Sequence, residues 1–236
     1  MCQFYSAIVT KTGELYHNPW TTSHEDIVAV FDLKDEKDNL CRVEFYPDID
    51  EDIWDYKKYN LHIDQQEPEW FKKFQTKTIS KLKLIIKNMI VTGEKQMLCG
   101  KVIILKDAKI GTLKNVLVYD MISSRVGKIC GSSQVGKICG SSQVGEMCGS
   151  SQVGKMCGSS QVGEMCSSSR VGEMYGSSRV GEMCGSSRVG EMYDSSQVGK
   201  MCGSSWVGEM YDSSQVGEMY GNSQVPKDKK PLKDLR

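Results

Sequence analysis

Residues 141–176 read SSQVGEMCG SSQVGKMCG SSQVGEMCS SSRVGEMYG, four consecutive copies of one nonapeptide. The repeat begins at Ser123 and runs without insertion through eleven copies to a truncated copy that ends in Pro226. A short fixed period is typical of a solenoid, in which each repeat packs only on its neighbours. The pattern therefore predicts a β-solenoid for this part of the chain.

The eleven copies indicate which positions lie inside the solenoid. The fourth position is always Val, and the seventh is Ile in two copies and Met in nine. In contrast, the third position is Gln, Arg or Trp, the sixth is Glu or Lys, and the eighth is Cys or Tyr. Because a thin core tolerates little change in side-chain volume, we expect Val, Met and one Ser to point inward. The variable positions then face outward.

The eighth position also indicates how many nonapeptides form one coil. Tyr175, Tyr193 and Tyr211 lie in even-numbered copies, whereas only Tyr220 lies in an odd-numbered copy. Trp206 belongs to an even-numbered copy as well. We therefore predict two nonapeptides, or 18 residues, per coil of a flattened solenoid with two faces. Duplication of an 18-residue gene segment would leave the same pattern.

The chain is expected to have four parts. These are a small α+β domain at 1–95, degenerate opening coils at 96–122, the regular solenoid at 123–225 and a charged tail at 226–236. In the opening coils, apolar residues recur every eight positions and lead into the Val column: Val102, Ile110, Val118 and Val126. Pro226 has no amide hydrogen and cannot continue a strand ladder, so the solenoid is expected to end there.

The N-terminal domain shows both strand and helix patterns. Alternating or apolar runs predict strands at Gln3–Thr10, Leu40–Tyr46 and Asn60–Asp64. Ser23, followed by acidic residues, is typical of a helix N-cap. Apolar residues spaced along one face after Pro68 predict a single helix of about five turns.

Composition excludes several classes of protein. The chain has 30 basic and 30 acidic residues, and its repeat region from Ser123 to Val225 has eight basic and nine acidic residues. This balance argues against a nucleic-acid-binding surface or an acidic mimic of DNA. No apolar stretch approaches the length of a membrane span, and no signal peptide is recognised at the N-terminus, so a cytoplasmic location is expected.

The cysteines are explained mainly by repeat copying. Seven of the ten lie at the eighth position of the nonapeptide, where Tyr replaces Cys in four copies. A flat column of thiols does not converge as zinc ligands do, so no metal site and no cofactor are expected. Disulfides between coils are not expected in a reducing compartment.

Cys2 and His24 are the candidates for catalysis. Removal of Met1 would expose Cys2 as an N-terminal nucleophile with its own amine as base. The opening Met-Cys resembles the class II glutamine amidotransferases over two residues only, because Gln3-Phe4 stands where that family has Gly-Ile. His24 could pair with Cys2, although a capping or surface role is the commoner one for a residue in a first helical turn. A buried thiol at a strand edge is the alternative for Cys2.

The even-numbered copies supply the candidate binding residues. Tyr175, Tyr193, Tyr211 and Trp206, with Arg170 and Arg188, form a set of aromatic and cationic side chains favoured at protein interfaces. Stacking of identical side chains along the ladder is the alternative explanation for the tyrosines.

The repeat resembles a set of uncharacterised bacteriophage and prophage proteins. The resemblance covers the nonapeptide SSQVGEM, the N-terminal MCQFYSAIVT, and the later SHED and PEWF. It implies a small phage protein that acts inside a bacterial host, and it carries no activity to transfer. The leading hypothesis is a non-enzymatic interaction protein that presents a rigid solenoid face to a protein partner or to another copy of itself. The alternative is an enzyme with Cys2 as nucleophile and the solenoid as scaffold.

Overall fold

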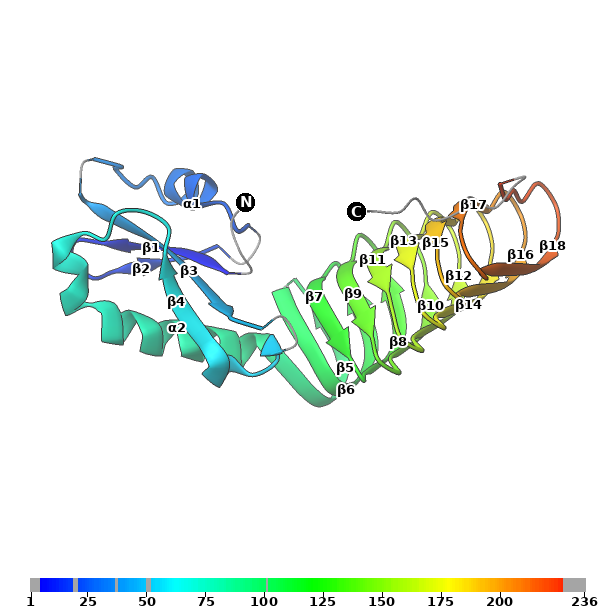
Figure 1. The fold of residues 1–236 in the computed structure, drawn as a ribbon, viewed down its shortest axis with the longest axis horizontal. Helices are drawn as coiled ribbons and strands as arrows, with labels where there is room; N and C mark the ends of the chain where they lie inside the picture. The colour runs from blue at the N-terminus through cyan, green and yellow to red at the C-terminus, as the bar shows by residue number, and fades with distance from the viewer. Residues whose placement is uncertain (1–4, 19–20, 37, 50–51, 101, 227–236) are drawn as a thin grey trace. The chain divides into compact units, whose positions relative to one another are not determined.

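The computed structural model describes residues 5–18, 21–36, 38–49, 52–100 and 102–226. The chain divides into two compact units, Met1–Ile90 and Val91–Arg236 (Figure 1). The first unit is a small α+β domain and the second is a β-solenoid, as the sequence predicts. The division falls at Ile90, a few residues before the expected boundary at 95.

The first unit contains a four-stranded antiparallel sheet in the order β2-β1-β3-β4. Its strands are β1 (Ser6–Thr10), β2 (Leu15–Tyr16), β3 (Leu40–Pro47) and β4 (Tyr59–Ile63). Both faces of the sheet are covered. Ile8 is buried on one face with Ile27, whereas Phe45 and Tyr59 are buried on the opposite face. The short helix α1 (His24–Val30) packs on this sheet through Ile27.

The helices confirm one prediction and correct another. The side chain of Ser23 accepts a hydrogen bond from the amide of Asp26, which is the N-cap expected for α1. The single helix expected after Pro68 is instead two elements, a 3-10 helix η3 (Glu69–Lys73) and the helix α2 (Gln75–Met89). The residues of η3 and the junction with α2 contact other segments. The Trp70 indole donates a hydrogen bond to the carbonyl of Asp38 at 2.6 Å, and the Phe74 ring lies against Gly13. A further 3-10 turn, η2, spans Tyr56–Lys58.

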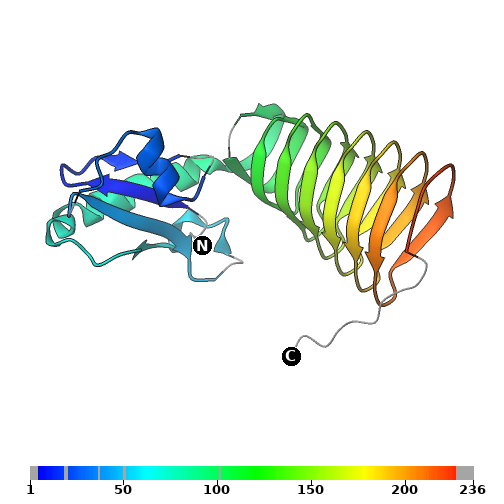
Figure 2. The same ribbon diagram turned by 90° about the horizontal axis from the view of Figure 1, so that it is seen from above.

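The solenoid is a stack of parallel strands joined by tight corners (Figure 2). It opens with β5 (Ile90–Cys99), β6 (Val102–Lys114) and β7 (Leu117–Ile122). One strand follows in each nonapeptide: β8 (Arg125–Cys130), β9 (Gln134–Cys139), β10 (Gln143–Met147), β11 (Gln152–Met156), β12 (Gln161–Met165), β13 (Arg170–Met174), β14 (Arg179–Met183), β15 (Arg188–Met192), β16 (Gln197–Met201), β17 (Trp206–Met210) and β18 (Gln215–Met219).

Each repeat strand pairs with the strand two nonapeptides away. Val144 lies beside Val162, and Val153 lies beside Val171, so neighbours in the ladder are 18 residues apart. The strands form one 14-stranded sheet, in which the β6–β7 pair joins two faces. The even-numbered strands from β6 to β18 carry the odd-numbered copies, and their face is called the odd face. The odd-numbered strands from β7 to β17 carry the even-numbered copies, and their face is called the even face. This arrangement confirms the coil of two nonapeptides.

The opening coils are held together by one long strand. β6 pairs with β7 through its first half and with β8 through its second half. Ile110 lies beside Val126 and Val118 lies beside Val135, so the inward columns of the repeat already begin in these coils.

The interior of the solenoid is the one that the repeat predicts. The Val and Met columns form a continuous core from Val126 to Met210, and every one of these side chains is buried. The inward Ser is the second of each copy, for example Ser142 and Ser160, both fully buried. The corners have positive φ, where Gly is usual and Asp194 and Asp212 also occur.

Candidate functional site

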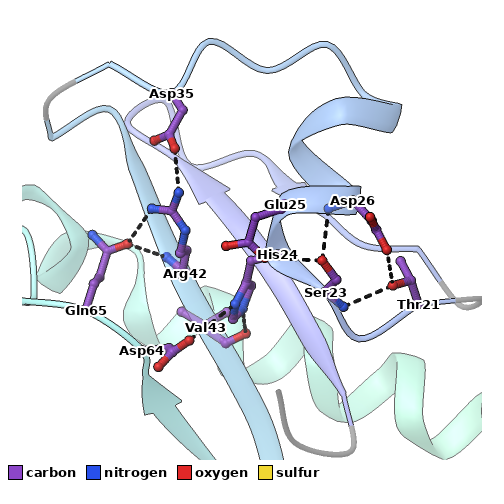
Figure 3. Close-up of polar contacts among 10 residues, drawn as sticks. All are labelled: Thr21, Ser23, His24, Glu25, Asp26, Asp35, Arg42, Val43, Asp64 and Gln65. Atoms are coloured by element: carbon purple, nitrogen blue, oxygen red, sulfur yellow. Dashed lines mark hydrogen bonds and ion pairs between the residues drawn. The ribbon is translucent and has the colours of Figure 1, made fainter. Parts of the chain in front are cut away.

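His24 lies at the start of α1 with both ring nitrogens facing oxygen atoms (Figure 3). Its Nε2 lies 3.1 Å from the carbonyl oxygen of Val43, and its Nδ1 lies 3.5 Å from a carboxylate oxygen of Asp64. The ring is only 1% exposed. The imidazole is therefore fixed between β3 and the residue that follows β4, instead of lying on the surface of a helical turn.

The surroundings of His24 are ordered by polar contacts along β3. The Arg42 guanidinium contacts Asp35 at 2.5 Å, and the backbone amide of Arg42 donates a hydrogen bond to Gln65 Oε1 at 3.0 Å (Figure 3). The side chain of Gln65 in turn donates to the carbonyl of Leu40 at 3.1 Å. These bonds tie the segment after β4 to β3 and so position Asp64 beside His24.

Glu44 also approaches His24. Ligand atoms of His24, Glu44 and Asp64 lie within 4.8 Å of one another. Cys2, the proposed partner of His24, lies outside the described residues. The sequence pattern did not indicate Glu44 or Asp64, since each lies in or beside an ordinary strand.

The tyrosine column of the even face is an integrated part of the solenoid. The rings of Tyr175, Tyr193 and Tyr211 stack in parallel, with centroids 4.8 and 4.6 Å apart. Each hydroxyl donates a hydrogen bond to the glutamate two residues earlier in the chain, and the Tyr175 bond to Glu173 is 2.7 Å long. The side chains are half-buried, not fully exposed as expected. This geometry supports the ladder-stacking explanation of the tyrosines.

Arg170, Arg188 and Trp206 form a second column on the even face. The register of β13, β15 and β17 places these three residues side by side at the first position of consecutive strands. They lie at the opposite end of each strand from the tyrosines, which directly follow the last strand residue. An extended strand advances about 3.3 Å per residue, so the two columns lie along different edges of the face.

The Arg–Trp column is the more accessible of the two. Trp206 is 41% exposed, and its ring lies over Gly208. Within the described part of the chain, neither guanidinium makes an ion pair or a side-chain hydrogen bond. Arg188 and Trp206, together with Ser204, Asn222 and Gln224, line a surface pocket of about 350 Å³.

The odd face carries a trough that the sequence analysis did not predict. A pocket of about 730 Å³ follows the glycine column from Gly111 to Gly181, and a second pocket continues it to Gly217. A Cβ atom in this column would lie within 2.7 Å of a carbonyl oxygen of the preceding coil, as at Gly163, where the distance is 2.6 Å. The invariant glycine of the nonapeptide is therefore required by coil spacing and leaves a row without side chains.

The cysteine columns correct the expectation that no disulfide joins the coils. Cys184 and Cys202 form a disulfide with their Cα atoms 4.8 Å apart. Cysteines that are 18 residues apart occupy neighbouring positions in the ladder, so the Cα atoms of every such pair have a similar separation. This separation lies in the range that disulfides use. Cys139 and Cys157 likewise have their sulfur atoms 2.7 Å apart.

The thiols also converge with carboxylates. Ligand atoms of Glu146, Cys148 and Cys166 lie within 4.8 Å of one another, as do those of Glu182, Cys184 and Cys202. The sequence prediction rested on the thiols alone and left out the glutamates two residues before Cys148 and Cys184. The 18-residue coil already predicted that Cys166 lies beside Cys148, and the missed signal is the Glu-x-Cys spacing of Glu146 and Cys148.

No helix among the described residues is both long and apolar enough to cross a bilayer. A scan against protein-family models, a search of curated proteins and a search of solved structures each find no match to the chain.

Proposed function

We propose that the chain is a non-enzymatic interaction protein, in which the even face of the solenoid binds an acidic segment of a protein partner. The binding residues are Arg170, Arg188 and Trp206. One observation carries the proposal: these three exposed side chains are adjacent in the ladder, and no described acidic residue neutralises the two guanidinium groups.

Adjacent like charges favour an external anion. Arg170 and Arg188 are cross-strand neighbours, and like charges at this spacing repel each other. A carboxylate of a partner could accept two hydrogen bonds from each guanidinium, while Trp206 would supply apolar contact area. Arg and Trp are the residue types that contribute most to binding free energy at protein interfaces.

The rigidity of the solenoid supports the same function. Each strand is fixed by ladder hydrogen bonds of about 2.9 Å to its neighbours, for example from the Arg188 amide to the carbonyl of Ser169 at 3.0 Å. The side chains of the column are therefore held at constant spacing before a partner arrives, which lowers the entropy lost on binding. The resemblance of the repeat to phage and prophage proteins makes a bacterial host protein the expected partner.

The test is capture of partners by the full chain and by variants that borrow residues from other copies. Other copies of the even face have Gln at the position of Arg and Trp, as at Gln134 and Gln152. The variant Arg170→Gln/Arg188→Gln/Trp206→Gln is therefore expected to fold normally. Capture of a specific protein should fall at least about tenfold in this variant, as expected for loss of central interface residues. Arg179→Gln, on the odd face, is the matched control and should capture normally.

Equal capture by the triple variant and the wild-type chain would contradict the proposal. Loss of self-association in the triple variant, measured by light scattering, would identify the partner as a second copy. The alternative enzymatic function is favoured by the pairing of His24 with Asp64. Labelling of Cys2 by iodoacetamide far faster than any other thiol, and slowed by Asp64→Asn, would support that enzyme instead.

A further inference from the structure

The thiols of the solenoid fall into two electrostatic classes. Cys148, Cys166 and Cys184 each follow a Glu by two residues, whereas the other four repeat cysteines each follow a Lys. The three Glu-associated thiols occupy consecutive coils of the odd face. Both cysteines of the even face, Cys139 and Cys157, belong to the Lys-associated class.

The carboxylates of this group form a row with incomplete charge compensation. Glu146 lies beside Glu164, and Glu164 lies beside Glu182, in the ladder. The two ends are paired with lysines, since Lys128 Nζ lies 2.9 Å from Glu146 and Lys200 Nζ lies 3.4 Å from Glu182. Within the described residues, no cation lies within ion-pair distance of Glu164. Like charges at this spacing are destabilising, so a bound cation would stabilise the row.

The donor atoms already converge at one end of the row. Glu146, Cys148 and Cys166 place one oxygen and two sulfur atoms within 4.8 Å of one another. The Cys166 thiol points at the Glu146 carboxylate, with 3.6 Å between Sγ and Oε1. A tetrahedral ion with zinc–sulfur bonds of about 2.3 Å holds two sulfur atoms about 3.8 Å apart, a spacing that small side-chain rotations would reach.

We infer that Glu146, Cys148 and Cys166 form a binding site for a thiophilic divalent cation of the zinc and cadmium class. Two thiolates and one carboxylate suit such ions, whereas calcium and magnesium prefer oxygen ligands alone. Three protein ligands leave a fourth position of a tetrahedral ion open to solvent. Binding replaces the thiol hydrogens of Cys148 and Cys166 with the ion and releases two protons to solvent.

The corresponding group in the later coils contains Cys184 and Cys202, which the structure holds as a disulfide and which reduction would make available.

The experiment is a titration of the reduced full chain with cadmium, followed by the ultraviolet charge-transfer band of cadmium thiolates and by calorimetry. All the proteins compared, including the one called wild type below, carry Cys184→Tyr/Cys202→Tyr, so that the corresponding group of the later coils cannot bind the ion. The variant Cys148→Tyr/Cys166→Tyr replaces both thiols with the residue that four other copies carry, as in Tyr175. The variant Glu146→Lys/Glu164→Lys similarly copies the Lys found in other repeats. Each should reduce cadmium affinity by more than about tenfold while leaving the circular dichroism spectrum unchanged.

The matched control is Cys139→Tyr/Cys157→Tyr, which removes the two Lys-associated thiols of the even face. It should retain the affinity and the charge-transfer band of the wild-type chain. A wild-type chain with no charge-transfer band at cadmium concentrations comparable to the protein would overturn the site. Equal loss of affinity in the even-face control would overturn it as well, because binding would then be a general property of the thiols.

Discussion

At the scale of the residue, the repeat assigns each position one physical role. Val and Met fill the core, the second Ser is buried, and the Gly after Val is fixed by the carbonyl of the coil before it. The inward roles of Val and Met could be predicted from the narrow exchange among copies. Both Ser positions are invariant in the eleven copies, and only the structure shows that the second one is buried. His24 could not be predicted in this way. Its burial depends on Asp64 and the carbonyl of Val43, which only the folded sheet brings near.

The two kinds of glycine should differ in their tolerance of side chains. At Gly163, a Cβ atom would lie 2.6 Å from the carbonyl oxygen of Gly145, although the local φ is unstrained. Gly163→Ala should therefore lower the free energy of unfolding by about 1–3 kcal/mol, as overpacking does elsewhere. Gly176 lies at a corner, and the same corner position is Asp194 and Asp212 in the next two coils. Gly176→Asp should therefore lower the free energy of unfolding by less than Gly163→Ala. Urea unfolding of both variants checks this order, and a larger loss in Gly176→Asp would contradict it.

At the scale of the element, columns of side chains matter more than single strands. The three stacked tyrosines, their glutamate acceptors and the carboxylates at the corners form continuous ladders. Asp194, for instance, accepts from the amide of Gly176 at 2.7 Å. The sequence indicated that Tyr175, Tyr193 and Tyr211 share a face. It did not indicate that they are half-buried, because their exposure depends on the bond of each hydroxyl to a glutamate beside it.

The tyrosine ladder predicts a loss of stability at alkaline pH. Burial, followed by the bond to Glu173, raises the pKa of Tyr175 to about 12, and chiefly the bond to Glu209 raises that of Tyr211 to about 12. An unfolded tyrosine ionises near pH 10, so between about pH 10 and 12 the folded chain binds more protons than the unfolded chain. The stabilisation is fully present below pH 10 and is lost as the pH rises through this window.

The measurement is the free energy of unfolding by urea at successive pH values. The variant Tyr175→Phe/Tyr193→Phe/Tyr211→Phe keeps the rings but has no hydroxyl to ionise, so its stability should fall less steeply across the same window. The lysines titrate in both proteins and cancel in the comparison. Identical slopes for the two proteins would show that the ladder hydroxyls do not contribute.

At the scale of the whole molecule, the coil of 18 residues controls all the surface features. It places Arg188 beside Trp206, Cys148 beside Cys166, and Tyr175 beside Tyr193. The period of nine and the grouping of Tyr in even-numbered copies favoured this coil, although duplication of an 18-residue gene segment would leave the same pattern. The trough along the glycine column and the convergence of Glu146 with two thiols were not predicted, because they depend on which side chains the ladder leaves absent or brings together.

The two proposals for the solenoid also belong to this scale, since they use opposite faces. The partner site lies on the even face and the cation site on the odd face, and each is formed by residues from successive coils. A coil of any other length would separate the members of both sites. Proof that residues 18 apart are neighbours, while residues nine apart are not, therefore tests the basis of both.

The most direct measurement is selective cross-linking of two single-pair variants. One retains only Cys184 and Cys202, whose Cα atoms lie 4.8 Å apart. The other retains Cys184 and carries Tyr193→Cys. In both variants every remaining cysteine is replaced by serine. Treatment with oxidised glutathione should join the first pair within the monomer, seen by mass spectrometry as a loss of two hydrogens. The second pair lies on opposite faces, which are about 10 Å apart, and should not be joined. Equal or preferred cross-linking of Cys184 to position 193 would contradict the two-nonapeptide coil.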